Sequence, residues 1–280
     1  MGRVDVKAHL AQLREGVAVL ASSAAWQRHL EFQSRFHHYS PRNTMLIASQ
    51  CEHASYVASY QRWQRLGRFV RKGEHAIWIL APVLGRNDPN PEGREEREAV
   101  RGFQLVPVFD LSQTDGAPVP SLCELLGAHV PTEHYARLCV VAQALGYRVQ
   151  DHDFAGAANG DCNYAERRLR VEVANPPAQR LKTLAHELAH AVLHADCADR
   201  SLAELEAESV AYVVCRILGV DTGSYSFGYV TAWAGGGAEA IAAINASCER
   251  IHRAVGVLIA TSVETTEDTN PSGSRNFAGC

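Results

Sequence analysis

The stretch His186-Glu187-Leu188-Ala189-His190 places two histidines four residues apart, with a glutamate directly after the first. In an α-helix this spacing puts both imidazoles on one face, one turn apart, so that they can bind a single zinc ion. The glutamate can then act as general base towards a water molecule that the metal activates. The motif therefore predicts a zinc-dependent hydrolase with His186 and His190 as ligands and Glu187 as the catalytic base.

The sequence around this motif predicts the helix that such a geometry requires. Asn175 is a typical N-cap residue, and Pro176 suits the first helical position. Apolar residues then recur at helical spacing: Leu181, Leu184, Ala185, Leu188, Ala191 and Val192. His194 lies on the same face as the motif, but it is two turns from His186 and therefore too far away to share the ion. The alternative interpretation is a buried helix whose histidines only bond to their neighbours.

A catalytic zinc ion normally has a third protein ligand. A second helix, predicted over residues 201–215, contributes Glu204, Glu206 and Glu208. Glu204 and Glu208 share a face with small alanines that would let the two helices approach closely, whereas Glu206 points elsewhere. On spacing alone, either of the two can be the ligand while the other supports a ligating histidine from behind. Glu204 could instead close a capping box with Ser201.

Length and composition limit the class of protein. With 280 residues, 46% of them hydrophobic, the chain is long enough for two domains with buried cores. No apolar run is long enough to cross a membrane, and the N-terminus does not have the pattern of a signal peptide. The eight cysteines are scattered and are expected to be reduced thiols. We therefore expect a cytoplasmic protein without a membrane partner.

The order of predicted elements indicates an α+β fold in two parts. A segment rich in Ser, Asp, Gly and Pro at residues 112–120 is typical of a linker. It divides the chain into domains at 1–118 and 119–263, followed by a polar tail at 264–280 that we expect to be disordered. Helices are predicted near 5–22, 24–37, 41–51, 57–66, 132–145, 176–194, 201–215 and 237–262, and strands near 76–83, 103–109, 147–150 and 168–173.

The N-terminal part carries a concentration of positive charge. Residues 28–72 contain eight Lys and Arg side chains against two Glu, a local charge of +6. Within it, residues 60–73 read Tyr-Gln-Arg-Trp-Gln-Arg-Leu-Gly-Arg-Phe-Val-Arg-Lys-Gly and mix aromatic rings with basic side chains. Arginines can neutralise phosphates and exposed rings can stack on unpaired bases, a combination that favours single-stranded nucleic acid. The alternative is an ordinary solvated basic surface over core aromatics.

Several of these stretches together resemble a known family. Asn43-Thr44-Met45-Leu46 and the run Leu-Gly-Arg-Phe-Val-Arg-Lys-Gly-Glu at 66–74 resemble the N-terminal domain of ArdC-type antirestriction proteins. The paired metal helices and Tyr229-x-x-x-Trp233 resemble that family's zincin-like domain. The resemblance implies a small N-terminal α/β domain that binds single-stranded DNA. A zincin-like, mainly helical metallopeptidase domain with a short antiparallel sheet would follow it. It also implies a plasmid- or phage-linked role in protecting transferred DNA, as in conjugation.

The resemblance also assigns residues. The family pattern favours Glu204 as the third Zn²⁺ ligand and Glu208 as the residue behind a ligating histidine. Tyr229 is a candidate for stabilising the oxyanion, the alternative being a core tyrosine. The predicted DNA-binding residues are Arg42, Asn43, Trp63, Arg65, Arg68, Arg71 and Lys72. We therefore predict a zinc peptidase with single-stranded DNA and an unidentified protein or peptide as partners. The alternatives are a DNA-binding shield with a non-catalytic zinc site, or a nuclease.

Overall fold

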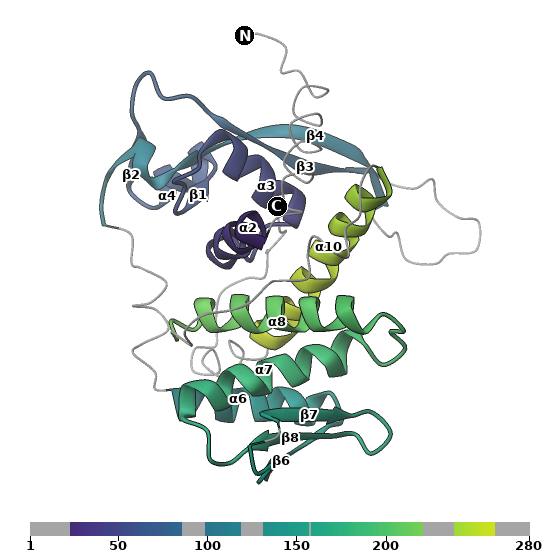
Figure 1. Ribbon diagram of the computed structural model, residues 1–280. Helices are drawn as coiled ribbons and strands as arrows, with labels where there is room; N and C mark the ends of the chain where they lie inside the picture. The colour runs from purple at the N-terminus through teal and green to yellow at the C-terminus, as the bar shows by residue number, and fades with distance from the viewer. Residues whose placement is uncertain (1–22, 86–98, 119–130, 157, 221–237, 261–280) are drawn as a thin grey trace, which may run out of the picture. The chain divides into compact units, whose positions relative to one another are not determined.

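The computed structural model describes residues 23–85, 99–118, 131–156, 158–220 and 238–260, and these form two compact units. The first contains the described residues from Arg42 to 118, and the second contains residues 23–41 together with the described residues from 131 onwards. Each unit combines helices with small sheets (Figure 1), so the α+β fold class is confirmed. Among the described residues, no helix has both the length and the apolar character needed to cross a bilayer.

The first unit is built on an antiparallel hairpin of β3 (Ile77–Gly85) and β4 (Ala99–Asp110). The short strand β1 (Val57–Ala58) pairs with the other edge of β4. A second, two-stranded sheet joins β2 (Arg68–Val70) to β5 (Thr114–Gly116). The helices are α3 (Pro41–Gln50) and α4 (Tyr60–Arg65), and the 3-10 turn η1 (Leu111–Gln113) follows β4. The helix predicted over 57–66 is therefore shorter, because Ser59 caps its N-terminus directly after β1.

Two amide side chains fasten α3 to β3. Asn43 accepts a hydrogen bond from the Leu80 backbone N–H at 2.8 Å and donates one to the Leu80 carbonyl at 2.9 Å. Gln50, two turns along the same helix, makes the equivalent pair with Trp78, with both distances 2.9 Å. Because the amide groups take the place of a neighbouring strand, they satisfy backbone groups that β3 would otherwise leave unpaired.

The second unit places one helix between a sheet and further helices. The sheet has the order β6-β8-β7, with β6 (Arg148–His152) parallel and β7 (Gly160–Asn163) antiparallel to β8 (Arg168–Glu172). Helix α7 (Pro177–Leu193) packs against this sheet on one side and against α8 (Arg200–Ile217) on the other (Figure 1). Helices α6 (Pro131–Ala144) and α10 (Ala238–Ala260) also belong to this unit.

Helix α2 (Ser23–Arg35) belongs to this second unit, although the predicted boundary at 118 would place it in the N-terminal domain. Its Trp26 is fully buried, and the indole N–H donates a 2.9 Å hydrogen bond to the Ser209 hydroxyl of α8. The apolar spacing of α2 predicted the helix correctly. The spacing could not say which apolar surface would cover it, because that depends on tertiary packing.

Helix α7 forms where its periodicity predicts. Leu181, Leu184, Ala185 and Leu188 are completely buried, and the polar residues between them face the neighbouring cleft. Its first residue is Pro177, and the N-cap position is held by Pro176 without a side-chain cap. The predicted N-cap role of Asn175 is therefore wrong. Its side-chain amide instead donates to the side chain of Asn159 at 2.9 Å.

Candidate metal centre

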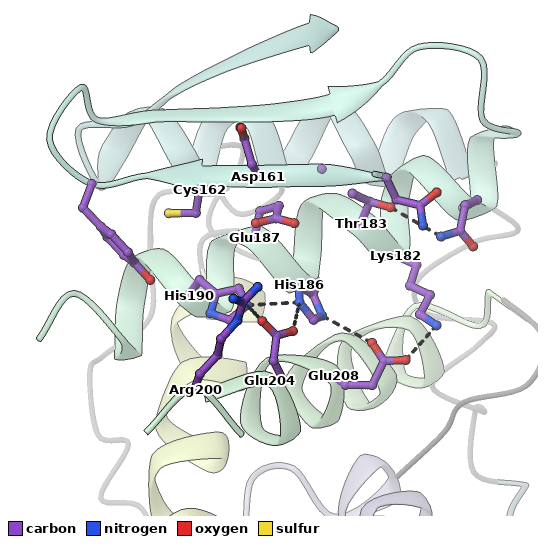
Figure 2. A pocket seen from close by; sticks show the side chains of 14 residues that line it. Asp161, Cys162, Lys182, Thr183, His186, Glu187, His190, Arg200, Glu204 and Glu208 are labelled. Atoms are coloured by element: carbon purple, nitrogen blue, oxygen red, sulfur yellow. Dashed lines mark hydrogen bonds and ion pairs between the residues drawn. The ribbon is translucent and has the colours of Figure 1, made fainter. Parts of the chain in front are cut away.

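Three potential metal ligands from two helices meet beside α7. The Nε2 atoms of His186 and His190 lie 3.1 Å apart. Glu204, from α8, places Oε2 3.4 Å from His186 Nε2 and Oε1 3.8 Å from His190 Nε2 (Figure 2). One nitrogen or oxygen from each of the three side chains fits within 4.8 Å of the others. Helices α7 and α8 thus bring the two histidines of the motif and the Glu204 carboxylate together.

These side chains fit a single divalent ion. Two imidazole nitrogens bound at 2.0–2.1 Å with tetrahedral geometry lie about 3.3 Å from each other. The observed separation of 3.1 Å between His186 Nε2 and His190 Nε2 is close to this value. Two imidazoles and one carboxylate also form a donor set found at catalytic zinc sites. Glu204 has 47% of its side chain exposed, so the proposed ion would face the cleft rather than the core.

Small residues allow the two helices to come this close. Ala185 and Ala189 on α7 are completely buried, as are Ala207 and Ala211 on α8. Larger side chains at these positions would separate the helix axes and carry the Glu204 carboxylate away from the two imidazoles. The close packing that the sequence predicted from the alanines of α8 is therefore present, with matching small residues on α7.

The structure separates the two glutamates that spacing alone left equivalent. Glu204 faces the Nε2 atoms, whereas Glu208 Oε2 lies 3.3 Å from His186 Nδ1, on the opposite side of that ring. The other oxygen of Glu208 forms a 2.8 Å ion pair with Lys182. The N-cap of α8 is Asp199, whose side chain accepts from the Leu202 N–H at 3.1 Å. The carboxylate of Glu204 is therefore not needed for a capping box.

The electrostatics of these groups reflect their crowding. Burial acts to lower the pKa of His186, but the carboxylates of Glu204 and Glu208 outweigh it and raise that pKa to about 9. Hydrogen bonds to the two imidazoles hold the pKa of Glu204 well below its usual range. The ionised Glu204 carboxylate attracts a cation, and an ion that binds here would displace the proton of His186, because only a neutral imidazole can ligate a metal.

Glu187 stands on the other side of the helix turn, towards β7. It is 7% exposed, and burial raises its pKa to about 7 despite the opposing effect of His186. A carboxyl group with this pKa can both accept and return a proton near neutral pH. Gly160 of β7 lies directly against it. A Cβ at position 160 would stand 2.9 Å from Glu187 Oε1 and 2.6 Å from Thr183 Cγ2, so this approach requires glycine.

A cavity of about 690 Å³ opens between strand β7 and helices α7 and α8. Besides the residues already described, it is lined by side chains that no sequence motif indicated (Figure 2). These are Asp161, Cys162, Tyr164, Gln179 and Arg200. Short polar strands such as β7 leave no clear alternation in the sequence, and the cavity-lining role of its residues emerges only when α7 packs beneath them.

The predicted DNA-binding residues fall into two groups. Asn43 and Trp63 are buried, and the indole N–H of Trp63 donates to the Phe109 carbonyl at 2.9 Å. Arg68 bonds Thr114 through both its side-chain hydroxyl and its carbonyl, each at 2.8 Å, and Arg71 pairs with Glu74 at 2.7 Å. Asn43, Trp63 and Arg68 hold the first unit together, so their surroundings do not support direct contact with DNA. Arg71 has 42% of its side chain exposed and stays a predicted DNA contact.

The remaining predicted residues, Arg42, Arg65 and Lys72, are exposed. The same segment also exposes large apolar side chains that the prediction did not select. Tyr60 is 48% exposed, Leu66 39% and Phe69 60%. The sequence did contain a signal for the position of the Phe69 ring. Phe69 alternates with Arg68 and Val70 along β2, so its side chain must point to the opposite face of the strand. The choice of Trp63 as the stacking ring was wrong because that ring fills the core.

Comparison with known sequences assigns both parts of the chain. Residues 10–109 match the N-terminal domain of the anti-restriction factor ArdC. Residues 142–215 match the IrrE N-terminal-like domain of the M78 peptidase family. The chain belongs to the ArdC-type antirestriction proteins. The second match runs from α6 to α8 and includes all five predicted residues of the metal centre.

A solved structure shows the same fold as this ArdC-type chain. The metal-free crystal structure of ArdC from plasmid R388 is 19% identical, with a TM-score of 0.50 over 81% of this chain and 86% of that one. The Mn(II)-bound crystal structure of the same protein is 20% identical, with a TM-score of 0.45 over 80% and 89%. An uncharacterized protein of Bacillus anthracis is 27% identical over 82% of this chain, which spans only 46% of that relative.

Tyr229, predicted to stabilise the oxyanion, lies outside the described residues, and so does Trp233. Within the described part, the M78-like domain presents two other polar side chains to the cavity that could face a substrate carbonyl. They are Tyr164, which follows β7, and Arg200, the first residue of α8.

Proposed function

We propose that this ArdC-type protein is a zinc-dependent peptidase whose N-terminal part binds single-stranded DNA. The single observation that supports the peptidase best is the arrangement on α7 and α8. Two imidazole Nε2 atoms lie 3.1 Å apart beside a carboxylate of α8, and Glu187, with a pKa of about 7, lines the same cavity. The match to the IrrE N-terminal-like domain of the M78 peptidase family agrees with this proposal.

The proposed chemistry is peptide hydrolysis. Zn²⁺ held by His186, His190 and Glu204 would acidify water and polarise the scissile carbonyl. Glu187 would take a proton from the attacking water and return it to the leaving amine. Its carboxylate lines the same cavity as the three proposed ligands, so water in that cavity can reach it. Arg200 or Tyr164 would stabilise the negative charge that develops on the carbonyl oxygen.

The shape of the cavity favours an extended peptide as substrate. Strand β7 is an edge strand, since among the described strands it pairs only with β8. Gly160, Asp161 and Cys162 of this strand line the cavity beside Glu187. An exposed strand edge can bind a polypeptide by adding a strand to the sheet. A peptide paired with β7 would therefore be aligned along the cavity, with its carbonyl groups close to the proposed metal.

The proposed DNA-binding surface is an aromatic–basic patch made by α4, β2 and the residues around them. We define it by exposed rings and apolar groups together with exposed cations of residues 60–72: Tyr60, Arg62, Arg65, Leu66, Phe69 and Lys72. No acidic residue occurs between 60 and 72, so this segment of the sequence carries only positive charges. Rings that stack on bases and cations that meet phosphates are the pairing typical of single-strand binders. The match to the N-terminal domain of ArdC agrees with this assignment.

Binding and cleavage would act together if the peptidase works on proteins that occupy single-stranded DNA. Tethering enzyme and target to one strand raises the local concentration of the target. The proposed antirestriction role then corresponds to removal of proteins from incoming DNA in the cytoplasm. A shield protein with a non-catalytic metal is the alternative. The cavity beside the site and the 47% exposure of Glu204 favour catalysis over a closed structural zinc site.

The peptidase is tested with a mixed peptide library read by mass spectrometry, with and without single-stranded DNA. The wild type loaded with Zn²⁺ should cleave peptides, and chelation should abolish cleavage. Glu187→Gln should keep the zinc and lose activity by about 10²–10⁴-fold, the usual contribution of a general base. Glu52→Gln, which makes the same change at an exposed carboxylate of the first unit, is the matched control. Equal cleavage by Glu187→Gln, or none by the wild type, would overturn the proposal.

The DNA surface is tested by fluorescence anisotropy with labelled single-stranded oligonucleotides. Phe69→Ala should weaken binding by the loss of one stacked base, about 1–3 kcal/mol. Phe103→Ala is the matched control, because Phe103 is also 60% exposed but lies on β4, outside the patch. If both variants bind DNA as the wild type does, the patch is not the DNA site.

A further inference from the structure

A chain of buried polar side chains leads away from His190 on the side opposite the proposed metal. His190 Nδ1 lies 3.0 Å from His194 Nδ1, and His194 Nε2 lies 3.2 Å from Glu206 Oε2. His194 is only 5% exposed and Glu206 only 1%. Neither belongs to the predicted site, and Glu206 was expected to point elsewhere. It does point away from the ligands, but His194 connects it back to them.

The far end of this chain is anchored on α10. Glu206 accepts a 2.6 Å hydrogen bond from the Ser247 hydroxyl. It also accepts from the guanidinium of Arg250, whose Nε lies 3.0 Å from both carboxylate oxygens. A buried carboxylate with these partners stays ionised and fixed in position, because leaving it unpaired would cost far more than the pairing. Three helices, α7, α8 and α10, therefore meet in one polar network.

We propose that His194 and Glu206 are positioning residues that set the tautomer and the orientation of His190 for metal binding. A metal bound to His190 Nε2 requires its proton to be on Nδ1. Among the described residues, His194 Nδ1 is the partner of that Nδ1–H and must therefore be the acceptor nitrogen. The remaining proton of neutral His194 is then on Nε2, where it donates to Glu206. One arrangement of protons satisfies every contact and leaves His190 Nε2 free to bind a metal.

The other tautomer of His194 shows why its hydrogen bond to Glu206 matters. If the proton of His194 were on Nδ1, it would face His190 Nδ1, and His190 would have to carry its own proton on Nε2. That tautomer cannot bind a metal through Nε2. The Glu206 carboxylate prevents it, because it can accept but cannot donate a hydrogen bond. His186 has a shorter support of the same kind, since Glu208 accepts directly from its Nδ1 at 3.3 Å.

The inference rests on the metal centre proposed above, and its test measures metal affinity rather than peptidase activity. Zn²⁺ alone is titrated into the full-length metal-free protein against a fluorescent chelator. His194→Phe keeps an aromatic ring but can neither accept nor donate, and should raise the Kd for zinc by about 10–100-fold. His194→Gln offers an amide oxygen to His190 and an amide N–H to Glu206, and should restore most of the affinity. His53→Phe makes the same change at an exposed histidine of the first unit and should bind zinc as the wild type does.

A second measurement needs no variant. Long-range ¹H–¹⁵N spectra of the zinc-loaded wild type should show His190 as the Nδ1–H tautomer and His194 as the Nε2–H tautomer. Wild-type zinc affinity in His194→Phe, or a His194 protonated on Nδ1, would overturn the proposal. A wild type that binds no zinc would overturn the metal centre itself. A wild type that binds zinc but cleaves no peptide would overturn only the peptidase, and the affinities of the variants would still decide the role of His194.

Discussion

Replacing Gly160 by alanine should disturb the cavity without touching the proposed metal ligands. The new Cβ would stand 2.6 Å from Thr183 Cγ2, 2.9 Å from the Arg170 carbonyl oxygen and 2.9 Å from Glu187 Oε1. Carbon atoms pack best at about 3.5–4.0 Å, so β7 would have to retreat from α7 by about 1 Å. Such overpacking typically costs about 1–3 kcal/mol of unfolding free energy.

The expected loss of unfolding free energy can be measured as a fall in Tm. A loss of about 2 kcal/mol lowers the Tm of a domain of 150–250 residues by roughly 4–8 °C. Peptide cleavage should fall more than zinc affinity, because the displaced strand carries the proposed substrate edge and one of the collisions is with the Glu187 carboxylate. Gly102→Ala is the matched control, because a Cβ at this strand position would meet no atom within 4 Å. It should leave both properties unchanged.

A double variant tests whether the collision with Thr183 Cγ2 causes this loss of stability. Thr183→Ser removes Cγ2, the nearest colliding atom, and keeps the hydroxyl that accepts from Gln179. In the background of Gly160→Ala it should recover part of the lost stability, while the 2.9 Å contact with the Arg170 carbonyl should prevent full recovery. A wild-type Tm for Gly160→Ala, or an equal loss in the single and double variants, would refute the proposed packing of β7 on α7.

Three further perturbations follow from burial and charge. Burial lowers the pKa of His29 from 6.5 to about 4, so the unfolded chain takes up this proton first as the pH falls. The unfolding free energy should therefore decline by up to about 3 kcal/mol between pH 6.5 and pH 4, and urea titrations of His29→Phe should show a smaller decline. Arg65→Ala combined with Lys72→Ala should reduce the salt slope of DNA binding by about 1.4, whereas an unchanged slope would move the phosphate contacts elsewhere. Asn43→Ala should cost about 2–3 kcal/mol in urea unfolding, because it leaves both backbone groups of Leu80 without their partner, and an unchanged midpoint would contradict that role.

The metal helices were predictable because their information is local. The spacing of Leu181, Leu184 and Leu188 fixes which side of α7 is buried, and the two histidines four residues apart must then share the remaining face. Family resemblance favoured Glu204 over Glu208, and the structure places them on opposite nitrogens of His186. Periodicity alone could not separate these two, since both lie on one helical face.

The incorrect predictions concern residues whose burial is decided by contacts with segments far away in the sequence. Trp63 and Asn43 have side chains that suit DNA binding, but both are buried by strands that come later in the sequence. The network behind His190 joins residues that are 12 and 44 positions apart, namely His194 with Glu206 and Glu206 with Arg250. No local pattern contains such a pairing, because it exists only when α7, α8 and α10 are assembled.

The side chains around the proposed ion explain why a metal such as zinc suits this site. Each ligating histidine is supported by a carboxylate that a cation already neutralises: Glu208 by Lys182, and Glu206 by Arg250. These outer carboxylates therefore orient the imidazoles without adding net charge at the ion. Glu204, which the imidazoles keep ionised, is left as the anionic ligand, while Arg200 lines the same cavity and offsets part of the charge of Glu187. The preference for zinc therefore comes from the donor set of two imidazoles and one carboxylate.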